Sequence, residues 1–215
     1  ASFDWAAILA DADWLHLSGI TPALGANAAE SALCALRAAS EAGVRISFDG
    51  NYRVKLWAGR ELEAPAILKE LLSYADLAFV TERDLAMIFG REFADRNAAF
   101  QAAFDAFPRL QFVAATVRAQ SSVDSYALSG GLTTRSGEWR SRLYELSGVI
   151  DRIGAGDAFA AGVLHGLTSG ADAQYTVDFA TAAAVFKHSI PGDFSIATCD
   201  EIERSVNDVS LDVRR

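Results

Sequence analysis

The stretch SGVIDRIGAGDAFAAGVLHGL, residues 147–167, decides how the rest of the chain is interpreted. An apolar, strand-like run leads into Gly-Ala-Gly-Asp at 154–157, and a helical pattern of small residues follows over 155–169. Gly154, Ala155 and Gly156 leave the backbone clear of bulky side chains, so consecutive N–H groups can point at one anion. The positive end of the helix dipole favours an ionised Asp157 in the first turn. Taken alone, the pattern fits equally a phosphate-binding turn and a tight structural turn with a first-turn charge.

The composition is that of a packed globular protein. Of the 215 residues, 51% are hydrophobic and 22% are charged, and the formal net charge is −9. Such an acidic chain lacks the basic face of a nucleic-acid or anionic-membrane binder. One local anion site remains compatible with this charge, because backbone N–H groups can form it.

Cysteine content and hydropathy indicate the cellular compartment in which the protein is expected. Cys34 and Cys199 are too few for a disulfide scaffold, and Cys34 lies in an alanine-rich helical pattern that predicts a small buried residue. We find no apolar run of 18 residues and no signal-peptide pattern. A cytoplasmic protein that neither spans nor binds a membrane is therefore expected.

Helical and strand-like patterns alternate along the chain. The 3.6-residue apolar spacing predicts helices over 2–11, 27–42, 62–74, 82–89, 96–106, 155–169 and 173–188. Short apolar runs between them predict buried parallel strands over 14–18, 45–49, 77–81 and 112–116. Between about 117 and 150, weaker alternation predicts appended antiparallel hairpins. The order indicates an α/β fold with a mostly parallel sheet, helices on both faces and a single domain over 1–215.

Polar residues follow the second predicted strand in the stretch FDGNYRVKLW, residues 48–57. Sites in open α/β sheets gather where strands end. Arg53 can hold a carboxylate or phosphate in a fork, while Asp49 and Asn51 fix the loop or bind sugar hydroxyls. An Asx turn followed by a solvated arginine is the simpler interpretation of the same residues.

A second polar strand end is VTERDLAMIFG, residues 80–90. Thr81 at the N-cap and Asp84 three residues later predict a variant capping box. A role for Asp84 or Glu82 near a hydrated metal ranks second.

An ionised carboxylate beside an anion cradle suggests a reaction at the anion. A site that only binds phosphate gains nothing from Asp157. The residue makes sense if it receives a proton from a hydroxyl that attacks the phosphate.

Three motifs resemble those of one enzyme family. DRIGAGDAFAAG (151–162) is similar to the C-terminal signature of the ribokinase-like, or PfkB, carbohydrate kinases, with Arg152 where threonine is usual. DGNYRVKLW (49–57) and FKHSIPGDF (186–194) are similar to segments of the 2-keto-3-deoxygluconate kinases within that family. The resemblance implies a three-layer α/β/α fold and the transfer of a phosphoryl group from ATP, with Mg²⁺, to a sugar hydroxyl.

The resemblance also implies roles for individual residues. Asp157 would be the catalytic base, and residues 154–156 would form the anion hole. Arg53 would bind the carboxylate of the sugar acid, with Asn51 and Tyr52 beside it and Asp193 contacting the acceptor from the other side.

Further roles concern the nucleotide, the ions and the assembly. The stretch from Thr116 to Ser122, with Arg118 as its cation, would lie along the nucleotide after a strand end. Lys187 and Ser189 would flank the adenine, and Asp84 is the candidate for the metal. A monovalent cation and a homo-oligomer are further expectations. The N-terminal third of the family, with its initial sheet, lid strands and Gly-Gly substrate motif, has no counterpart here, so the chain resembles the C-terminal two-thirds of such an enzyme.

Alternatives remain at this point. A fructokinase or another sugar kinase of the same fold would need no partner for a substrate carboxylate. A non-catalytic nucleotide- or sugar-binding remnant is the interpretation that the missing segment favours. A dinucleotide-dependent oxidoreductase is disfavoured, because no Gly-x-Gly-x-x-Gly follows an early strand.

Overall fold

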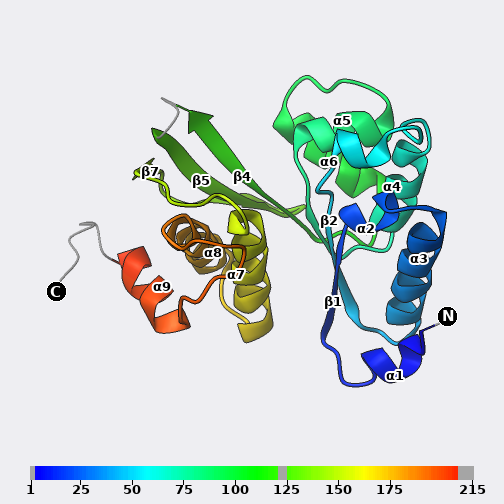
Figure 1. The fold of residues 1–215 in the computed structure, drawn as a ribbon, viewed down its shortest axis with the longest axis horizontal. Coiled ribbons are helices and arrows are strands. Elements are labelled where there is room, and N and C mark those ends of the chain that lie inside the picture. The colour runs from blue at the N-terminus through cyan, green and yellow to red at the C-terminus, as the bar shows by residue number, and fades with distance from the viewer. Residues whose placement is uncertain (1–2, 121–124, 208–215) are drawn as a thin grey trace. The chain divides into compact units, whose positions relative to one another are not determined.

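The computed structural model describes residues 3–120 and 125–207. Their contacts divide the chain into two compact units. Unit 1 comprises Ala1–Val113 and Thr133–Ser136, and unit 2 comprises Ala114–Leu132 and Gly137–Arg215. In the described residues the strand order is β1-β2-β3-β4-β5-β6, with β7 paired to β5 (Figure 1). The predicted α/β fold with a mostly parallel sheet is confirmed.

Unit 1 is built from alternating strands and helices. They are α1 (Trp5–Leu9), β1 (Trp14–Ser18), α2 (Ile20–Ala23), α3 (Ala26–Glu41), β2 (Arg45–Asp49), η1 (Val54–Trp57), α4 (Ala64–Leu72), β3 (Leu77–Phe79), α5 (Glu82–Phe89) and α6 (Arg96–Ala106). Strand β2 lies parallel to both β1 and β3. Their carboxyl ends therefore meet at one edge of the sheet.

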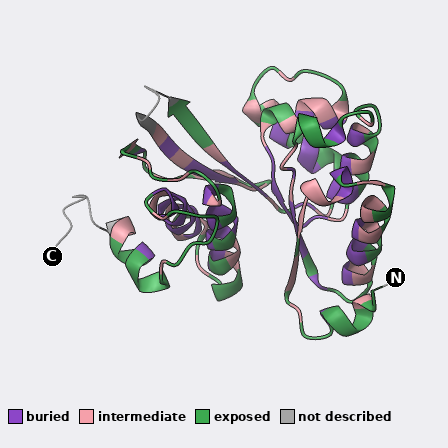
Figure 2. Ribbon diagram, viewed as in Figure 1, coloured by how far each residue is buried: buried purple, intermediate pink, exposed green. Residues whose placement is uncertain are grey.

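Apolar side chains of the strands and of the inward helix faces form the core of unit 1. Ile46 and Phe48 of β2 and Leu77 of β3 are fully buried, as are Leu36 of α3 and Leu68 of α4. Figure 2 shows this burial along the strands and on one side of each helix. The outward face of α3 carries Cys34, which is exposed. The prediction of a buried Cys34 is wrong because the buried residues 32, 35, 36 and 39 follow the helical spacing and position 34 falls between them.

A buried carboxylate fixes the opposite end of the strands. Asp76 accepts a hydrogen bond of 2.8 Å from the N–H of Ile46 and forms an ion pair of 3.1 Å with Arg109. Arg109 also donates to Ser40 and to the carbonyl of Val44. Because its partners satisfy this buried charge, the cluster is part of the scaffold.

Unit 2 contains β4 (Phe112–Gln120), which begins in unit 1, and the remaining elements. These are β5 (Ser125–Thr133), β6 (Glu138–Arg140), β7 (Tyr144–Ser147), α7 (Ala155–Ser169), α8 (Ala173–Lys187) and α9 (Cys199–Asn207). Strands β5 and β7 are antiparallel, with Leu128 opposite Tyr144, which confirms an antiparallel addition in this region.

Small residues bring α7 and α8 together. A Cβ on Gly162 would lie 2.5 Å from the Cα of Ala180, and one on Gly166 would lie 2.5 Å from the hydroxyl of Thr176. Helix α7 ends at Gly170 in the left-handed conformation, and the Asp172 side chain caps α8. The two helices therefore form a tightly packed hairpin.

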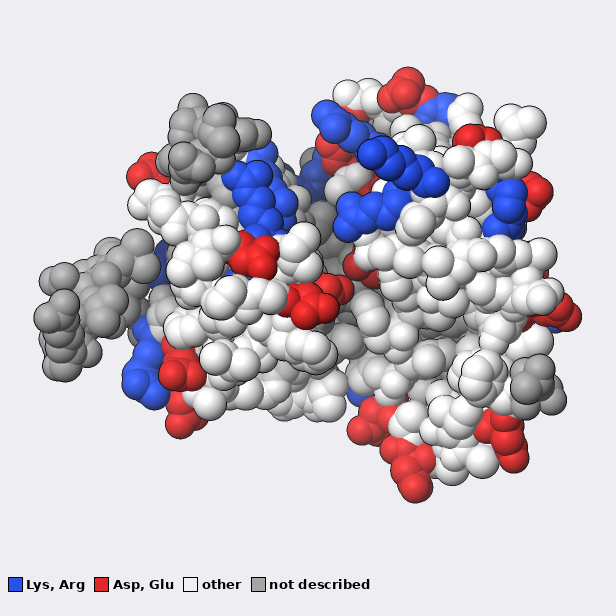
Figure 3. Space-filling model, in the orientation of Figure 1, with Lys and Arg blue, Asp and Glu red and all other residues white. Residues whose placement is uncertain are grey.

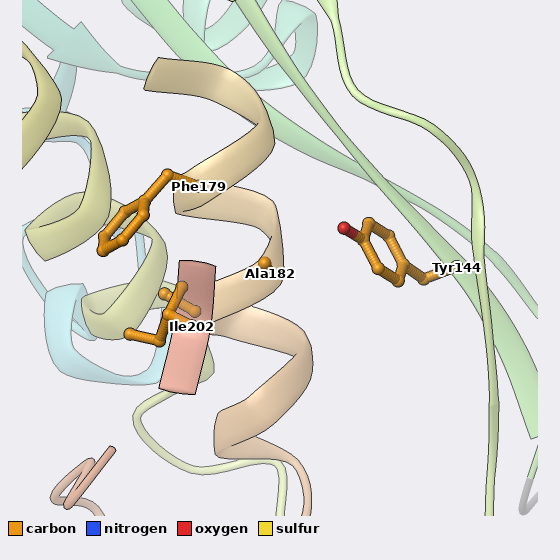
Figure 4. Close-up of a cluster of buried hydrophobic side chains, with 5 residues drawn as sticks. Tyr144, Phe179, Ala182 and Ile202 are labelled. Atoms are coloured by element: carbon orange, nitrogen blue, oxygen red, sulfur yellow. The ribbon is translucent and has the colours of Figure 1, made fainter. Parts of the chain in front are cut away.

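A second cluster attaches α9 and β7 to this hairpin. Figure 4 shows Tyr144 of β7, Phe179 and Ala182 of α8 and Ile202 of α9, which are members of one buried hydrophobic cluster. The cluster gives unit 2 a core of its own.

The predicted fourth strand is too short. Strand β4 continues from the expected end at 116 to Gln120, so Thr116 and Arg118 lie within a strand and not after one. Ala114 and Ala115 are buried, whereas Val117 and Arg118 are exposed. The outer half of β4 is paired with its neighbour in the sheet but lacks the apolar pattern that would reveal it. None of the helices within the described ranges is long and apolar enough to cross a membrane.

Candidate functional site

The ends of β1, β2 and β3 approach each other closely in unit 1. Gly19 donates its N–H to the carbonyl of Asp49 at 2.7 Å, and Gly50 donates to the carbonyl of Phe79 at 2.9 Å. A Cβ on Gly19 would overlap the carbonyl oxygen of Gly50. Only glycine at position 19 therefore allows the two strand ends to come this close.

Asn51 turns the chain away from this edge. Its φ of +36° is unusual for a residue other than glycine, although asparagine tolerates this region better than most. The Asn51 N–H donates to the Asp49 carboxylate at 3.0 Å, and its side-chain amide donates to the hydroxyl of Ser18 at 3.3 Å. The predicted Asx turn is present, and the Asn51 side chain also links the end of β2 to the end of β1. Ser18 was not predicted as part of the site. Its only signal was its position at the end of an apolar run.

Arg53 follows on an anchored segment. Trp57 of η1 is fully buried, and its ring stacks on that of Tyr52 with 6.5 Å between ring centroids. The Arg60 guanidinium lies over Trp57 and donates to the carbonyl of Pro22. The Arg53 side chain is exposed, and none of the residues described by the structure pairs with its guanidinium. A fixed backbone thus presents a cation that an incoming anion can bind.

Asp84 completes the capping box that the sequence predicts. Its Oδ2 accepts hydrogen bonds of 2.8 Å from both the N–H and the hydroxyl of Thr81, and Thr81 in turn accepts from the Asp84 N–H. The carboxyl carbon of Asp84 lies 3.8 Å from an ideal Cβ on Gly50, at the same strand edge. No cluster of three or more metal-binding side chains is found in the described part of the chain.

In unit 2, the backbone requires glycine at position 154, before α7, but not at position 156, within the helix. Gly154 is the N-cap with a φ of +77°, and a Cβ there would overlap the carbonyl oxygen of Asp193. Gly156 lies inside the helix, and a Cβ on it would meet nothing within 4 Å. Glycine in a helix costs about 0.5–1 kcal/mol relative to alanine. No packing contact in the described residues requires glycine at position 156, and this glycine leaves the backbone of the first turn open.

The residues around Gly156 leave this approach accessible. Ala155 is buried and supports the turn, whereas Asp157 is exposed in the first turn of α7. The first N–H groups of a helix have no partner within it and carry partial positive charge. The turn therefore presents N–H groups that can bind an anion, with a carboxylate in the same helical turn.

The loop that carries Asp193 is attached to the same turn. Asp151 accepts hydrogen bonds from the N–H of Ile153 at 2.9 Å and from that of Gly192 at 2.8 Å. These two bonds, with the nearby Lys187 ammonium, hold the pKa of the Asp151 carboxyl below its usual range. Asp193 itself is exposed. The turn before Asp157 and the loop that carries Asp193 are thus joined by the hydrogen bonds of Asp151.

Lys187 and His188 lie beneath this loop. The Lys187 side chain is fully buried, and its Nζ donates to the carbonyl of Ile190 at 2.8 Å. Burial, followed by the nearby cations of Arg118, Lys187 and Arg152, lowers the pKa of His188. The lowered pKa favours the neutral form of His188, and its Nδ1–H donates to the carbonyl of Ala184 at 2.6 Å.

The remaining nucleotide candidates lie on β4 or outside the described residues. Thr116 is half-buried and Arg118 exposed on this strand, and the last residues of the predicted stretch, Ser121 and Ser122, are not among the described residues. Ser189 donates its hydroxyl to the carbonyl of Phe186.

Charge is unevenly distributed on the face drawn in Figure 3. Basic side chains gather over the part of unit 1 that carries α5, and acidic ones prevail near the loop between α1 and β1. In a chain with a net charge of −9, this local excess of basic side chains suits an acidic small molecule.

Known proteins share both the sequence and the fold. A 2-dehydro-3-deoxygalactonokinase of Haloferax volcanii is 30% identical over 197 residues, which are 92% of this chain and 58% of that protein. A pfkB family carbohydrate kinase of Listeria grayi has a similar structure, with a TM-score of 0.91 and 35% identity over 97% of this chain and 64% of its own. For a 2-dehydro-3-deoxygluconokinase of Thermotoga maritima, the TM-score is 0.88 at 33% identity, over 96% of this chain and 64% of its own.

The chain therefore spans less than two thirds of the length of these relatives. The match to the family described as pfkB family carbohydrate kinase covers residues 1–194, including both the strand edge of unit 1 and the turn at α7. This chain belongs to the pfkB family of carbohydrate kinases.

Proposed function

We propose that this protein transfers the γ-phosphoryl group of ATP to a hydroxyl of a 2-keto-3-deoxy sugar acid, most simply 2-keto-3-deoxygluconate, to form its 6-phosphate. The observation that carries the proposal is Gly156, which has no packing role and leaves the backbone N–H groups of α7 open beside Asp157. Backbone donors held at a helix start stabilise the charge on a transferring phosphoryl group.

Asp157 acts as the base in this proposal. The acceptor hydroxyl gives its proton to the Asp157 carboxylate as its oxygen bonds to the γ-phosphorus. The bond between that phosphorus and the oxygen bridging to the β-phosphate breaks, and ADP leaves. A loose transition state requires little basicity, so an exposed, ionised carboxylate that orients the hydroxyl is sufficient. Gly154, Ala155 and Gly156 form the anion hole.

The acceptor is identified by its acid group. The Arg53 guanidinium has no partner within the described ranges, lies on the segment anchored by Trp57 and suits a bidentate bond to a carboxylate. Asn51 and Tyr52 are the neighbouring candidate contacts, and Asp193 is a further candidate contact to the acceptor. The names of the Haloferax and Thermotoga relatives both denote kinases of 2-dehydro-3-deoxy sugar acids, which carry a carboxylate and a keto group in common.

ATP and Mg²⁺ are the implied cosubstrate and metal. Thr116 and Arg118 of β4 are the candidate nucleotide contacts. Mg²⁺ in kinases is held by substrate phosphates, water and one or two carboxylates. Asp84 would hold the ion with Oδ1, directly or through water, because its Oδ2 accepts both bonds from Thr81. When bound, Mg²⁺ would neutralise charge on the phosphates.

A panel of acceptors tests the proposal. ADP release is measured with 2-keto-3-deoxygluconate, 2-keto-3-deoxygalactonate, fructose and ribose in parallel. We expect turnover with the two acids and little with the neutral sugars, because only the acids offer Arg53 a carboxylate. Preference for fructose would favour a fructokinase. Retained ATP binding without turnover on any acceptor would favour the non-catalytic alternative.

A further inference from the structure

The loop of residues 188–193, here called the return loop, contacts the segment that precedes α7 at both of its ends. The carbonyl of His188 accepts from the N–H groups of Ile150 at 3.0 Å and Asp151 at 3.3 Å. At the other end of the loop, the backbone of Asp193 lies directly against Gly154. All of these residues belong to unit 2.

Asp151 joins the two segments through its side chain. One carboxylate oxygen accepts from Ile153 in the turn before α7, and the other accepts from Gly192 in the return loop. An oxygen of a carboxylate accepts N–H bonds well, whereas an asparagine amide offers only one such oxygen. Both oxygens of Asp151 are thus needed to hold both segments.

Lys187 holds the return loop from the inner side. Its ammonium is fully buried and donates to the carbonyl of Ile190, and it lies close enough to Asp151 to lower the pKa of that carboxyl. Burying an ammonium is costly unless opposite charge and acceptors surround it. The Lys187 ammonium is therefore already hydrogen-bonded to the return loop, and its burial disfavours the adenine contact that the resemblance implies.

We propose that Asp151 and Lys187 are positioning residues that lock the return loop onto the turn that precedes α7. Their effect is to keep the N–H groups of Gly154–Gly156 and the carboxylate of Asp193 in one preorganised arrangement. The inference rests on the proposed function, because phosphoryl transfer is the reaction for which this arrangement matters. Donors that are fixed before the reaction contribute more than donors that must be ordered during it.

Hydrogen–deuterium exchange in the ligand-free protein tests the lock itself. Asp151→Asn keeps the size of the side chain but removes one acceptor oxygen, and Lys187→Met removes the ammonium. We expect peptides covering the return loop to exchange about fivefold faster in both variants. Asp172→Asn is the matched control, since its bond to the Tyr175 N–H is confined to the start of α8. Unchanged exchange in the return loop of Asp151→Asn and Lys187→Met would overturn the lock.

Steady-state kinetics test the positioning role. In the folded fraction of both variants we expect kcat to fall about tenfold or more, with KM for ATP nearly unchanged. A role of Lys187 in holding the adenine would instead raise KM for ATP without loosening the loop. Faster loop exchange with wild-type kcat would overturn the positioning role. Should the wild-type protein transfer no phosphate, the proposed function fails, while the exchange experiment still decides whether the lock exists.

Discussion

At the scale of single residues, Arg53 carries the proposed choice of substrate. Its guanidinium has no partner among the described residues, while Tyr52 and Trp57 fix the backbone on either side. We predict that Arg53→Ala raises KM for a 2-keto-3-deoxy sugar acid about 10- to 100-fold, as expected for the loss of a charge-assisted bond pair. KM for ATP should stay nearly constant. Initial-rate kinetics with each substrate varied in turn measure both values.

Lys55 supplies the matched control for Arg53. It is an exposed cation in the same η1 segment. Lys55→Ala should change KM for the acid by less than about twofold, because an exposed charge contributes little. Equal effects of the two substitutions would mean that Arg53 acts only through the general charge of this surface. An unchanged KM in Arg53→Ala would remove Arg53 from the substrate site.

The different roles of neighbouring residues could not all be predicted from the sequence. The sequence predicted Gly154 and Gly156 as equivalent members of an anion cradle. The structure separates them, because Gly154 is required by a left-handed backbone and by Asp193, whereas Gly156 faces open space. Contacts between residues so distant in the chain leave no local pattern. For the same reason the bond from Asp151 to Gly192 and the role of Ser18 in holding Asn51 could not be predicted.

At the scale of elements, helix α7 combines an open start with a tightly packed middle. The same substitution at two glycines of this helix should therefore have opposite effects on stability. Gly162→Ala should lower the free energy of unfolding by about 1–3 kcal/mol, because the new Cβ meets the Cα of Ala180 at 2.5 Å. Gly156→Ala should raise it by about 0.5–1 kcal/mol through helix propensity.

The functional consequences of these two substitutions should also differ. Gly156→Ala should reduce kcat strongly despite its greater stability, since the added methyl group stands where a phosphoryl group must approach the backbone. Gly162→Ala should leave kcat of the folded protein nearly intact. Urea titration and steady-state assays on the same preparations check this. A fully active Gly156→Ala protein would show that position 156 is not part of the anion hole.

Element boundaries were predictable where local chemistry marks them. Helices over 82–89, 96–106 and 155–169 begin and end as predicted, since Thr81, Asp95 and Gly154 mark their starts. Helix α1 is shorter than the predicted 2–11 and ends at Leu9, because Ala10–Asp13 lack a buried face to continue it. Strand β4 is longer than predicted, because pairing in the sheet extends it beyond its buried residues.

For the whole molecule, the alternation of helices and apolar runs was enough to predict the α/β class and the parallel strands β1, β2 and β3, but not the order of the strands in the sheet. The division into two compact units could not be predicted, because each unit takes segments from separate parts of the chain. The single domain over 1–215 stays a prediction. The candidate groups divide between the units, with Arg53 and Asn51 in unit 1 and Asp157 and Asp193 in unit 2.

The start of α7 is the proposed phosphoryl-transfer centre, with Asp157 as its base. The most direct measurement compares kcat and ATP affinity in Asp157→Asn with those of the wild-type protein, using Asp172→Asn at the start of α8 as the control. We predict that kcat with 2-keto-3-deoxygluconate falls by about 10²- to 10⁴-fold, while the Kd for a non-hydrolysable ATP analogue changes by less than about twofold. Near wild-type kcat in Asp157→Asn would contradict the account.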